Sequence, residues 1–233
     1  MRTHLLTGAG SGIGAALAEV LHDRGDHLVL PARSERRAAE LAERFPGAQT
    51  PVLDLADPAA IEGLAGLPER LDSLLHVAGV VELAPVADVT YAELREQLDV
   101  NLVAPALLTR ACLPALREAR GLVVFVNSAA GLTAGASWSA YAASKFGLRA
   151  LADSLRAEEM DHGVRVTTVF PSRTATPMQE KVHEQEGRTY DPAHWIRPET
   201  VVSTLLHVLD LPPDATIPEV TVRPVVPWRP AGS

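Results

Sequence analysis

Short apolar runs rich in leucine and valine recur along the chain, and segments with helical spacing of apolar residues separate most of them. Strands that are this continuously apolar are typical of a parallel sheet covered by helices on both faces. The alternation predicts an α/β fold, with a doubly wound parallel sheet of about seven strands and right-handed crossovers, in a single domain over residues 1–233. The predicted strands are residues 3–7, 27–30, 48–53, 71–77, 121–127, 164–170 and 219–224. The predicted helices are residues 12–24, 34–44, 58–66, 90–118, 138–161 and 198–209.

One long stretch, residues 172–197, carries no clear helix or strand pattern. Segments of this length in compact domains are usually lids, binding segments or disordered. We therefore expect a substrate lid at about residues 172–197. The proline-rich tail after Pro224 is expected on the surface.

Composition excludes several classes of protein. A net charge of −8 disfavours a nucleic-acid binder. A single cysteine, Cys112, excludes an internal disulfide and a cysteine-cluster metal site, and the histidines lack zinc-ligand spacing, so no metal is expected. The chain begins almost at once with a predicted strand, which leaves no room for a signal peptide. Its most apolar region, residues 121–151, is interrupted by Asn127 and Lys145 and does not resemble a membrane span. We expect a cytoplasmic protein.

A glycine-rich turn follows the first predicted strand, with four glycines in the seven residues from Gly8 to Gly14. Such a turn between a strand and a helix lets the backbone approach a pyrophosphate, and the helix N-terminus offers unpaired N–H groups to the phosphates. The spacing is T-G-x-x-x-G-x-G, from Thr7 to Gly14, and differs from the G-x-G-x-x-G of ordinary two-domain dehydrogenases. Taken alone, the motif also fits a turn that binds no ligand.

Four polar residues further along the chain indicate acid–base chemistry. Tyr141 and Lys145 lie four residues apart in a predicted helix, so both side chains leave the same face. An ammonium beside a phenol lowers its pKa from about 10, although this spacing also occurs by chance in many helices. Ser128 follows an apolar strand, at the sheet edge where open α/β folds bind ligands. Asn101 lies inside a predicted helix, where asparagine is a poor helix former.

The glycine turn TGAGSGIG together with these four residues resembles the joint signature of the classical short-chain dehydrogenase/reductase (SDR) family, over about residues 3–225. The resemblance implies a Rossmann-like fold. It also implies that Tyr141 is the general acid in reduction and the base in oxidation. Lys145 would hold the nicotinamide ribose and tune Tyr141, Ser128 would bind the substrate oxygen, and Asn101 would anchor a water chain to Lys145.

The resemblance also implies a cofactor site. Asp54 matches the acidic residue that touches the adenine, and Thr176 lies where the family contacts the nicotinamide amide. The full predicted set is Thr7, Gly8, Ser11, Gly12, Ile13, Gly14, Arg33, Asp54, Leu55, Ala78, Gly79, Asn101, Tyr141, Lys145, Pro171, Thr174 and Thr176.

The sequence departs from the family pattern in three places. H-V-A-G at residues 76–79 replaces the usual N-N-A-G, and we expect His76 to be a structural substitute rather than a catalyst. Pro-Ser at residues 171–172 replaces the usual Pro-Gly, which leaves the path of the lid open. Pro31 ends the second predicted strand, where it is tolerated only if its missing N–H faces away from a neighbouring strand.

The end of the second predicted strand predicts the cofactor. Ala32 stands where NAD-specific relatives carry a carboxylate, and Arg33 beside it can bind the ribose 2′-phosphate of NADP(H). Ser11 stands where many NADP-using relatives carry a second basic residue. The alternative is that Arg33 only caps the next helix in solvent; the rest of residues 33–45 is expected to be a mostly solvated helix face. We predict NADP(H), with NAD(H) less favoured.

The sequence thus predicts an NADP(H)-dependent oxidoreductase that transfers a hydride between the nicotinamide and a small carbonyl or alcohol substrate. The alternative is a catalytically silent dinucleotide-binding regulatory or scaffold protein, which would not need Asn101, Ser128, Tyr141 and Lys145 together. The resemblance further implies a homotetramer or homodimer built on the helices at 90–118 and 138–161. Arg173 is expected to be solvated, with contact to an acidic substrate as the alternative.

Overall fold

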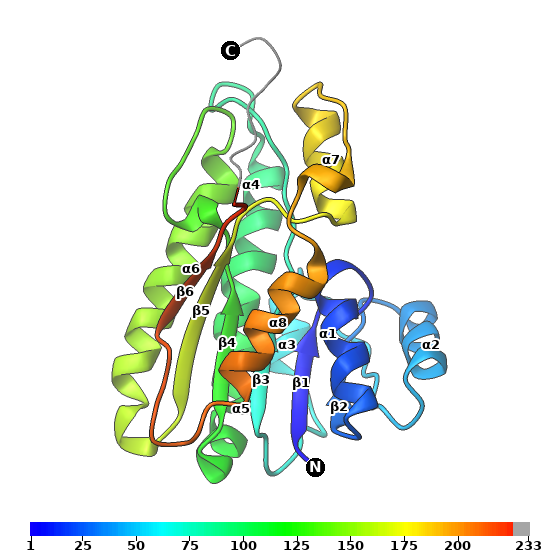
Figure 1. Ribbon diagram of the computed structural model, residues 1–233, viewed down its shortest axis with the longest axis vertical. Coiled ribbons are helices and arrows are strands. Elements are labelled where there is room, and N and C mark those ends of the chain that lie inside the picture. The colour runs from blue at the N-terminus through cyan, green and yellow to red at the C-terminus, as the bar shows by residue number, and fades with distance from the viewer. Residues whose placement is uncertain (226–233) are drawn as a thin grey trace.

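The computed structural model describes residues 1–225 and contains a parallel sheet with helices on both faces (Figure 1). The six strands pair in the order β2-β1-β3-β4-β5-β6, and every neighbouring pair is parallel. This confirms the predicted doubly wound α/β fold in one domain. The strands are β1 (Thr3–Thr7), β2 (His27–Val29), β3 (Ser73–His76), β4 (Leu122–Val126), β5 (Arg165–Pro171) and β6 (Glu219–Val222).

Helices form two layers around the sheet. One core cluster joins it to α1, α2 and α8, and a second joins it to α3, α5 and α6. The helices are α1 (Gly12–Asp23), α2 (Glu35–Arg44), α3 (Pro58–Glu62), α4 (Tyr91–Leu98), α5 (Ala104–Ala119), α6 (Ser139–Glu158), α7 (Pro177–Gln185) and α8 (Pro198–Leu209).

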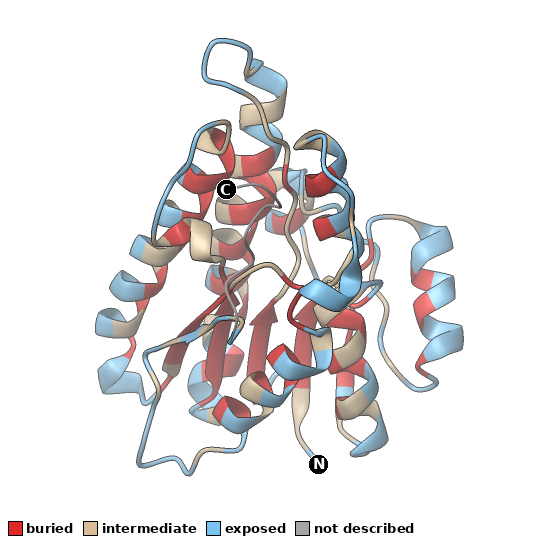
Figure 2. Ribbon diagram, turned by 45° about the horizontal axis from the view of Figure 1, so that its top comes forward, coloured by how far each residue is buried: buried red, intermediate tan, exposed pale blue. Residues whose placement is uncertain are grey.

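Burial on both faces explains the continuous apolar strands. In β4, Val123 and Phe125 belong to one core cluster, whereas Val124 and Val126 belong to the other. Successive side chains of a strand point to opposite faces, so each face needs its own apolar residue. The central strands are accordingly buried along their length between the helices (Figure 2).

Within residues 1–225 the sheet has six strands rather than about seven. Residues 48–53 run beside β2 but form only two isolated parallel bridges, Val29 with Gln49 and Ala32 with Val52. Between these bridges lies Pro51, which has no N–H to donate to the neighbouring segment at β2. The missing bond interrupts the ladder, so the predicted third strand is wrong as a regular element. Pro31 lies beyond Val29, the last residue of β2 paired with β1.

Two helical regions differ from the sequence prediction. The predicted helix 90–118 is divided into α4 and α5 by a π-helical turn, Asp99–Val103, which contains Asn101. Within the stretch predicted as a lid, the structure contains α7, which begins at Pro177 after the capping residue Thr176. The proline-rich tail lies almost wholly outside the described residues.

Candidate active site

A cleft of about 1250 Å³ lies at the carboxyl ends of β1 to β5. Two of the predicted site residues, Thr7 and Asn101, do not line it. The predicted residues that do are Gly8, Ser11, Gly12, Ile13, Gly14, Arg33, Asp54, Leu55, Ala78, Gly79, Ser128, Tyr141, Lys145, Pro171, Thr174 and Thr176.

The glycine turn is required by close backbone packing. Gly8 has φ +80°, and a Cβ on it would lie 2.8 Å from the backbone N of Ala78. A Cβ on Gly14 would lie 2.1 Å from the carbonyl oxygen of Gly8. Gly10, by contrast, has nothing within 4 Å of such a Cβ and faces open space in the cleft. The turn is thus tight on its inner side and open toward the cleft.

The N-terminus of α1 is suited to an anion. Its capping residue Ser11 makes no side-chain cap hydrogen bond within the described part of the chain, and the first turn carries no acidic residue. The first-turn amides therefore keep their donor capacity, and the helix dipole favours negative charge there. A pyrophosphate fits this position.

Thr7 supports the turn from behind. Its buried hydroxyl accepts hydrogen bonds from the backbone N–H groups of Val77 (3.1 Å) and Ala78 (3.2 Å). The residue predicted to bind cofactor therefore fixes the loop after β3 on which Ala78 and Gly79 lie.

Tyr141 and Ser128 form a hydrogen-bonded pair in the cleft. Burial raises the pKa of Tyr141 to about 12, and the hydrogen bond with Ser128 offsets only part of that increase. The Lys145 ammonium lies 5.8 Å from the centre of the Tyr141 ring. The expectation of a lowered Tyr141 pKa is wrong for this structure, because burial of the phenol raises its pKa more than the hydrogen bond with Ser128 lowers it.

Lys145 is buried, and its Nζ donates to the carbonyl oxygen of Val126 at 3.3 Å. Burial lowers the pKa of Lys145 to about 8. The strand β4 and the helix α6 thus fix the ammonium beside the phenol.

Asn101 occupies the π-helical turn, where the wide turn gives its side chain a tertiary role. Its Nδ2 donates to the carbonyl oxygen of Val80 (2.9 Å) and to Oγ of Ser144 (3.0 Å), and its Oδ1 accepts from the N–H of Val80 (2.9 Å). Asn101 therefore joins the loop after β3 to α6 directly behind the cleft. The predicted water chain stays a prediction.

Asn127 is a residue that the sequence analysis missed. Its side chain donates to the carbonyl oxygen of Lys145 (2.9 Å) and accepts from the N–H of Ser128 (2.8 Å). It thus aligns both functional residues. A signal was available, because Asn127 is a polar residue at the end of an apolar strand.

His76 lies inside the sheet. Its ring stacks on Phe125 at 4.9 Å, its Nε2 is 2.9 Å from Oγ1 of Thr109, and burial with the nearby Lys145 charge lowers its pKa to about 3. The ring is uncharged at neutral pH and its contacts are structural, as predicted.

One end of the cleft, beyond the carboxyl end of β2, carries several basic residues. Arg33 is exposed and makes no hydrogen bond or ion pair with any of residues 1–225. Ser34 already caps α2 by accepting from the N–H of Arg37, so the helix does not need Arg33 as a cap. Arg37, which we expected on a solvated face, lines the cleft and is held by Glu40 at 2.7 Å.

Arg173 is not a solvated arginine. Its guanidinium lies 5.7 Å from the ring centre of Trp138 and 5.5 Å from that of Trp195, and it donates to both carboxylate oxygens of Glu186. Trp138 in turn packs edge-on against Tyr141, with ring centres 5.7 Å apart.

Known proteins are similar to this chain in sequence and in fold. A family model described as short chain dehydrogenase matches residues 2–187. Dehydrogenase/reductase SDR family member 7B of Bos taurus is 35% identical over 201 residues, which cover 80% of this chain and 62% of that protein. The chain therefore spans less than two thirds of that relative.

Among solved structures, the closed form of a serine dehydrogenase complexed with NADP+ has a TM-score of 0.86 at 26% identity, covering 99% of this chain and 98% of that one. A short-chain dehydrogenase from Streptomyces avermitilis has a TM-score of 0.80 at 27% identity, covering 95% and 88%. With the glycine turn and the cleft described above, these likenesses show that the chain belongs to the short-chain dehydrogenase/reductase family, as an oxidoreductase acting on CH–OH groups.

Proposed function

We propose that the chain is an NADP(H)-dependent oxidoreductase that transfers a hydride between the nicotinamide and a small carbonyl or alcohol substrate. The observation that carries this proposal is the meeting of Ser128, Tyr141 and Lys145 in one cleft, whose other part is the glycine turn at α1. A silent nucleotide-binding protein would need the turn but not the three polar residues.

Proton transfer falls to Tyr141. With a pKa of about 12, its phenol holds its proton at neutral pH and can donate it to the substrate's carbonyl oxygen during reduction. The Ser128 hydroxyl binds the same oxygen as negative charge develops there. The Lys145 ammonium stabilises the phenolate that remains, and oxidation runs the transfer backwards. The nicotinamide cofactor, when bound, supplies or accepts the hydride.

The residues present fit such a cofactor. The open face at Gly10 and the uncapped amides of α1 suit the pyrophosphate, and Asp54 with Leu55 would contact the adenine. Arg33, supported by Arg37, would bind the 2′-phosphate. At the other end of the cleft, the nicotinamide would contact Pro171, Thr174 and Thr176.

Three further parts of the proposal concern the whole protein. The stretch 172–197, which includes α7, acts as a lid; the protein is a homodimer or homotetramer; and it works in the cytoplasm. The last is supported by the single cysteine, Cys112, whose thiol is buried and unpaired.

The test is Tyr141→Phe, assayed by NADPH absorbance with a panel of ketones and aldehydes. The ring and its packing remain while the proton donor is lost, so we expect normal folding, normal cofactor binding and loss of more than about nine tenths of kcat. Tyr91→Phe, at an exposed position on α4, is the matched control and should keep full activity. A Tyr141→Phe enzyme that keeps a tenth or more of kcat refutes the role of the phenol.

A further inference from the structure

The Arg173–Glu186 pair lies at the substrate end of the cleft. Two guanidinium nitrogens of Arg173 donate to the two carboxylate oxygens of Glu186, at 2.8 and 2.5 Å. Only 27% of the Arg173 side chain and 14% of the Glu186 side chain are exposed. Arg188 makes a second, longer contact with Glu186 at 3.6 Å. A bidentate, half-buried pair of this kind fixes the orientation of the guanidinium and balances its charge.

The surroundings of the pair are apolar. Trp138 and Trp195 pack around the guanidinium, and Met178 and Val182 of α7 cluster with Val81 and Tyr141. Of the other cations lining the described cleft, Lys145 belongs to the reacting centre, Arg33, Arg37 and Arg44 lie at the adenosine end, and Arg223 is exposed. Arg173 is therefore the half-buried cation that a substrate carboxylate would meet beside the indole rings. Its charge is already paired with Glu186.

We infer that Glu186 is a specificity-determining residue, which occupies Arg173 and thereby excludes carboxylate-bearing substrates in favour of neutral carbonyls or alcohols with an apolar or aromatic flank. The inference rests on the proposed function. A substrate carboxylate at this place would lie near the Glu186 carboxylate, and the charge of Arg173 that would attract it is already balanced by Glu186. Discrimination of this kind works by repulsion rather than by a new attraction.

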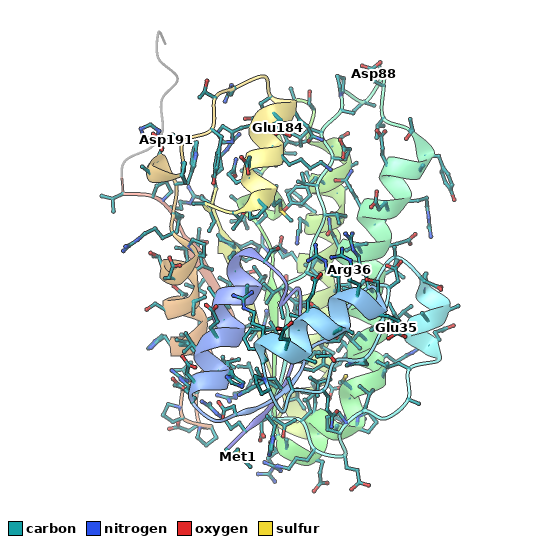
Figure 3. The ribbon with its side chains drawn as sticks, turned by 90° about the vertical axis from the view of Figure 1, so that its right-hand side faces the viewer. Met1, Glu35, Arg36, Asp88, Glu184 and Asp191 are labelled. Atoms are coloured by element: carbon teal, nitrogen blue, oxygen red, sulfur yellow. The ribbon has the colours of Figure 1, made fainter. Side chains whose placement is uncertain are left out.

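A pair of ketones that differ by one carboxylate tests the inference. Wild-type enzyme should reduce acetophenone with a kcat/KM at least about tenfold above that for para-acetylbenzoate, and Glu186→Gln should remove or reverse this preference. The amide keeps the size of the side chain and releases the guanidinium charge. Glu184→Gln is the control, because Glu184 is exposed on the same helix (Figure 3) and should leave the ratio unchanged.

Ligand binding gives a second readout that needs no turnover. Trp138 and Trp195 flank the guanidinium, so their fluorescence should report benzoate at this place. We expect benzoate to bind Glu186→Gln at least about tenfold more tightly than wild type, and Arg173→Gln added to it should abolish the gain. The double variant removes both members of the ion pair, so loss of the gain assigns benzoate binding to Arg173.

The outcomes separate the two proposals. If wild type prefers para-acetylbenzoate, or if Glu186→Gln leaves benzoate affinity unchanged, Glu186 does not set specificity, while the proposed function stands. If wild type reduces neither these ketones nor any other carbonyl, the proposed function fails, and the benzoate titration still decides whether Glu186 excludes carboxylates.

Discussion

At the scale of single residues, exclusion of water sets the protonation of the reactive groups. Burial raises the pKa of Tyr141 to about 12 and lowers that of Lys145 to about 8. It also lowers the pKa of His76 to about 3, with a smaller contribution from Lys145. In each case burial shifts the equilibrium toward the uncharged form, although Lys145, with a pKa of about 8, still carries its proton at neutral pH. The phenol therefore rests as a proton donor, which is the state that carbonyl reduction requires.

The buried ammonium gives a pH-dependent stability. Since the pKa of Lys145 is lowered from 10.5 to about 8, the unfolded chain holds a proton between these values that the folded chain has released. Raising the pH through this window therefore favours folding. Relative to Lys145→Met, the free energy of unfolding of wild type should rise by up to about 3 kcal/mol across the window, measured by urea unfolding. Lys181→Met, which replaces an exposed lysine, is the control. The free energy of unfolding of this variant should rise across the window as much as that of wild type.

We expect two residues to set the choice of cofactor. Ala32 leaves no carboxylate to repel a 2′-phosphate, and Arg33 has no partner among the described residues. We expect kcat/KM for NADPH to exceed that for NADH by at least about tenfold, which one charge-assisted contact can supply. Ala32→Asp combined with Arg33→Ala should reverse the ratio. Arg36→Ala, on α2 outside the cleft lining (Figure 3), should leave it unchanged. Equal use of both cofactors by wild type contradicts this prediction.

At the scale of elements, α7 is attached to the body by a few polar contacts on two sides. Lys181 pairs with Glu82 at 2.6 Å, and Gln185 also bonds to Glu82 and, at 3.1 Å, to the N–H of Leu83. On the other side, the contact is the pair of Arg173 with Glu186. The apolar contacts of α7 come from Val182 and Met178, which cluster with Val81, Leu83 and Tyr141. An element held in this way can open at low cost.

Hydrogen exchange should detect that opening. We expect residues 177–196 to exchange faster than the rest of the chain without ligands, and to gain protection when NADPH and a ketone are bound. Helix α2 provides the comparison, because it is exposed but contacts only the adenosine end, and its change with the ketone should be small. Equal protection of 177–196 in both states would argue against a lid.

Sequence patterns predicted the elements whose cause is local. Strands β1, β3, β4 and β5 were found because each is a continuous buried run. The break at Pro51 is a local effect as well and was overlooked. Helix α7 was missed because its nine residues include few apolar ones, and tertiary contacts with Glu82 and Arg173 supply what the pattern lacks.

The sequence could predict which polar residues meet in the cleft, but not the contacts that support them. Ser128, Tyr141 and Lys145 are recognisable from their spacing and place. The bracing of the turn by Thr7 and the alignment by Asn127 depend on contacts between segments far apart in the chain. The partners of Arg173 likewise come from three separate segments. No local sequence pattern indicates such contacts between distant segments.

At the scale of the whole molecule, the long helix pair and α6 leave apolar surface uncovered. By length and composition alone, Tyr91–Ala119 is apolar enough to cross a membrane, and 39% of its most apolar window is buried. It packs on the sheet and against α6, where Phe146 remains 44% exposed. A second copy of the chain would cover this surface.

The mass in solution tests this prediction. Light scattering should give a dimer or tetramer for wild type, and Phe146→Glu should lower the mass, because a buried unpaired carboxylate opposes association. Val52→Glu changes an equally exposed residue (45%) beside β2 and should leave the mass unchanged. A monomeric wild type would contradict the proposal.

The π-helical turn at Asp99–Val103 also has a consequence for how length can vary in this chain. The turn holds one residue more than an α-helical turn. Loss of that residue would close the wide turn into an ordinary α-helical one and would remove the widened backbone from which Asn101 reaches Val80 and Ser144. A deletion of one residue would therefore damage the site even though the helices on either side could join without a break. The count of residues, as much as their identity, is part of the site.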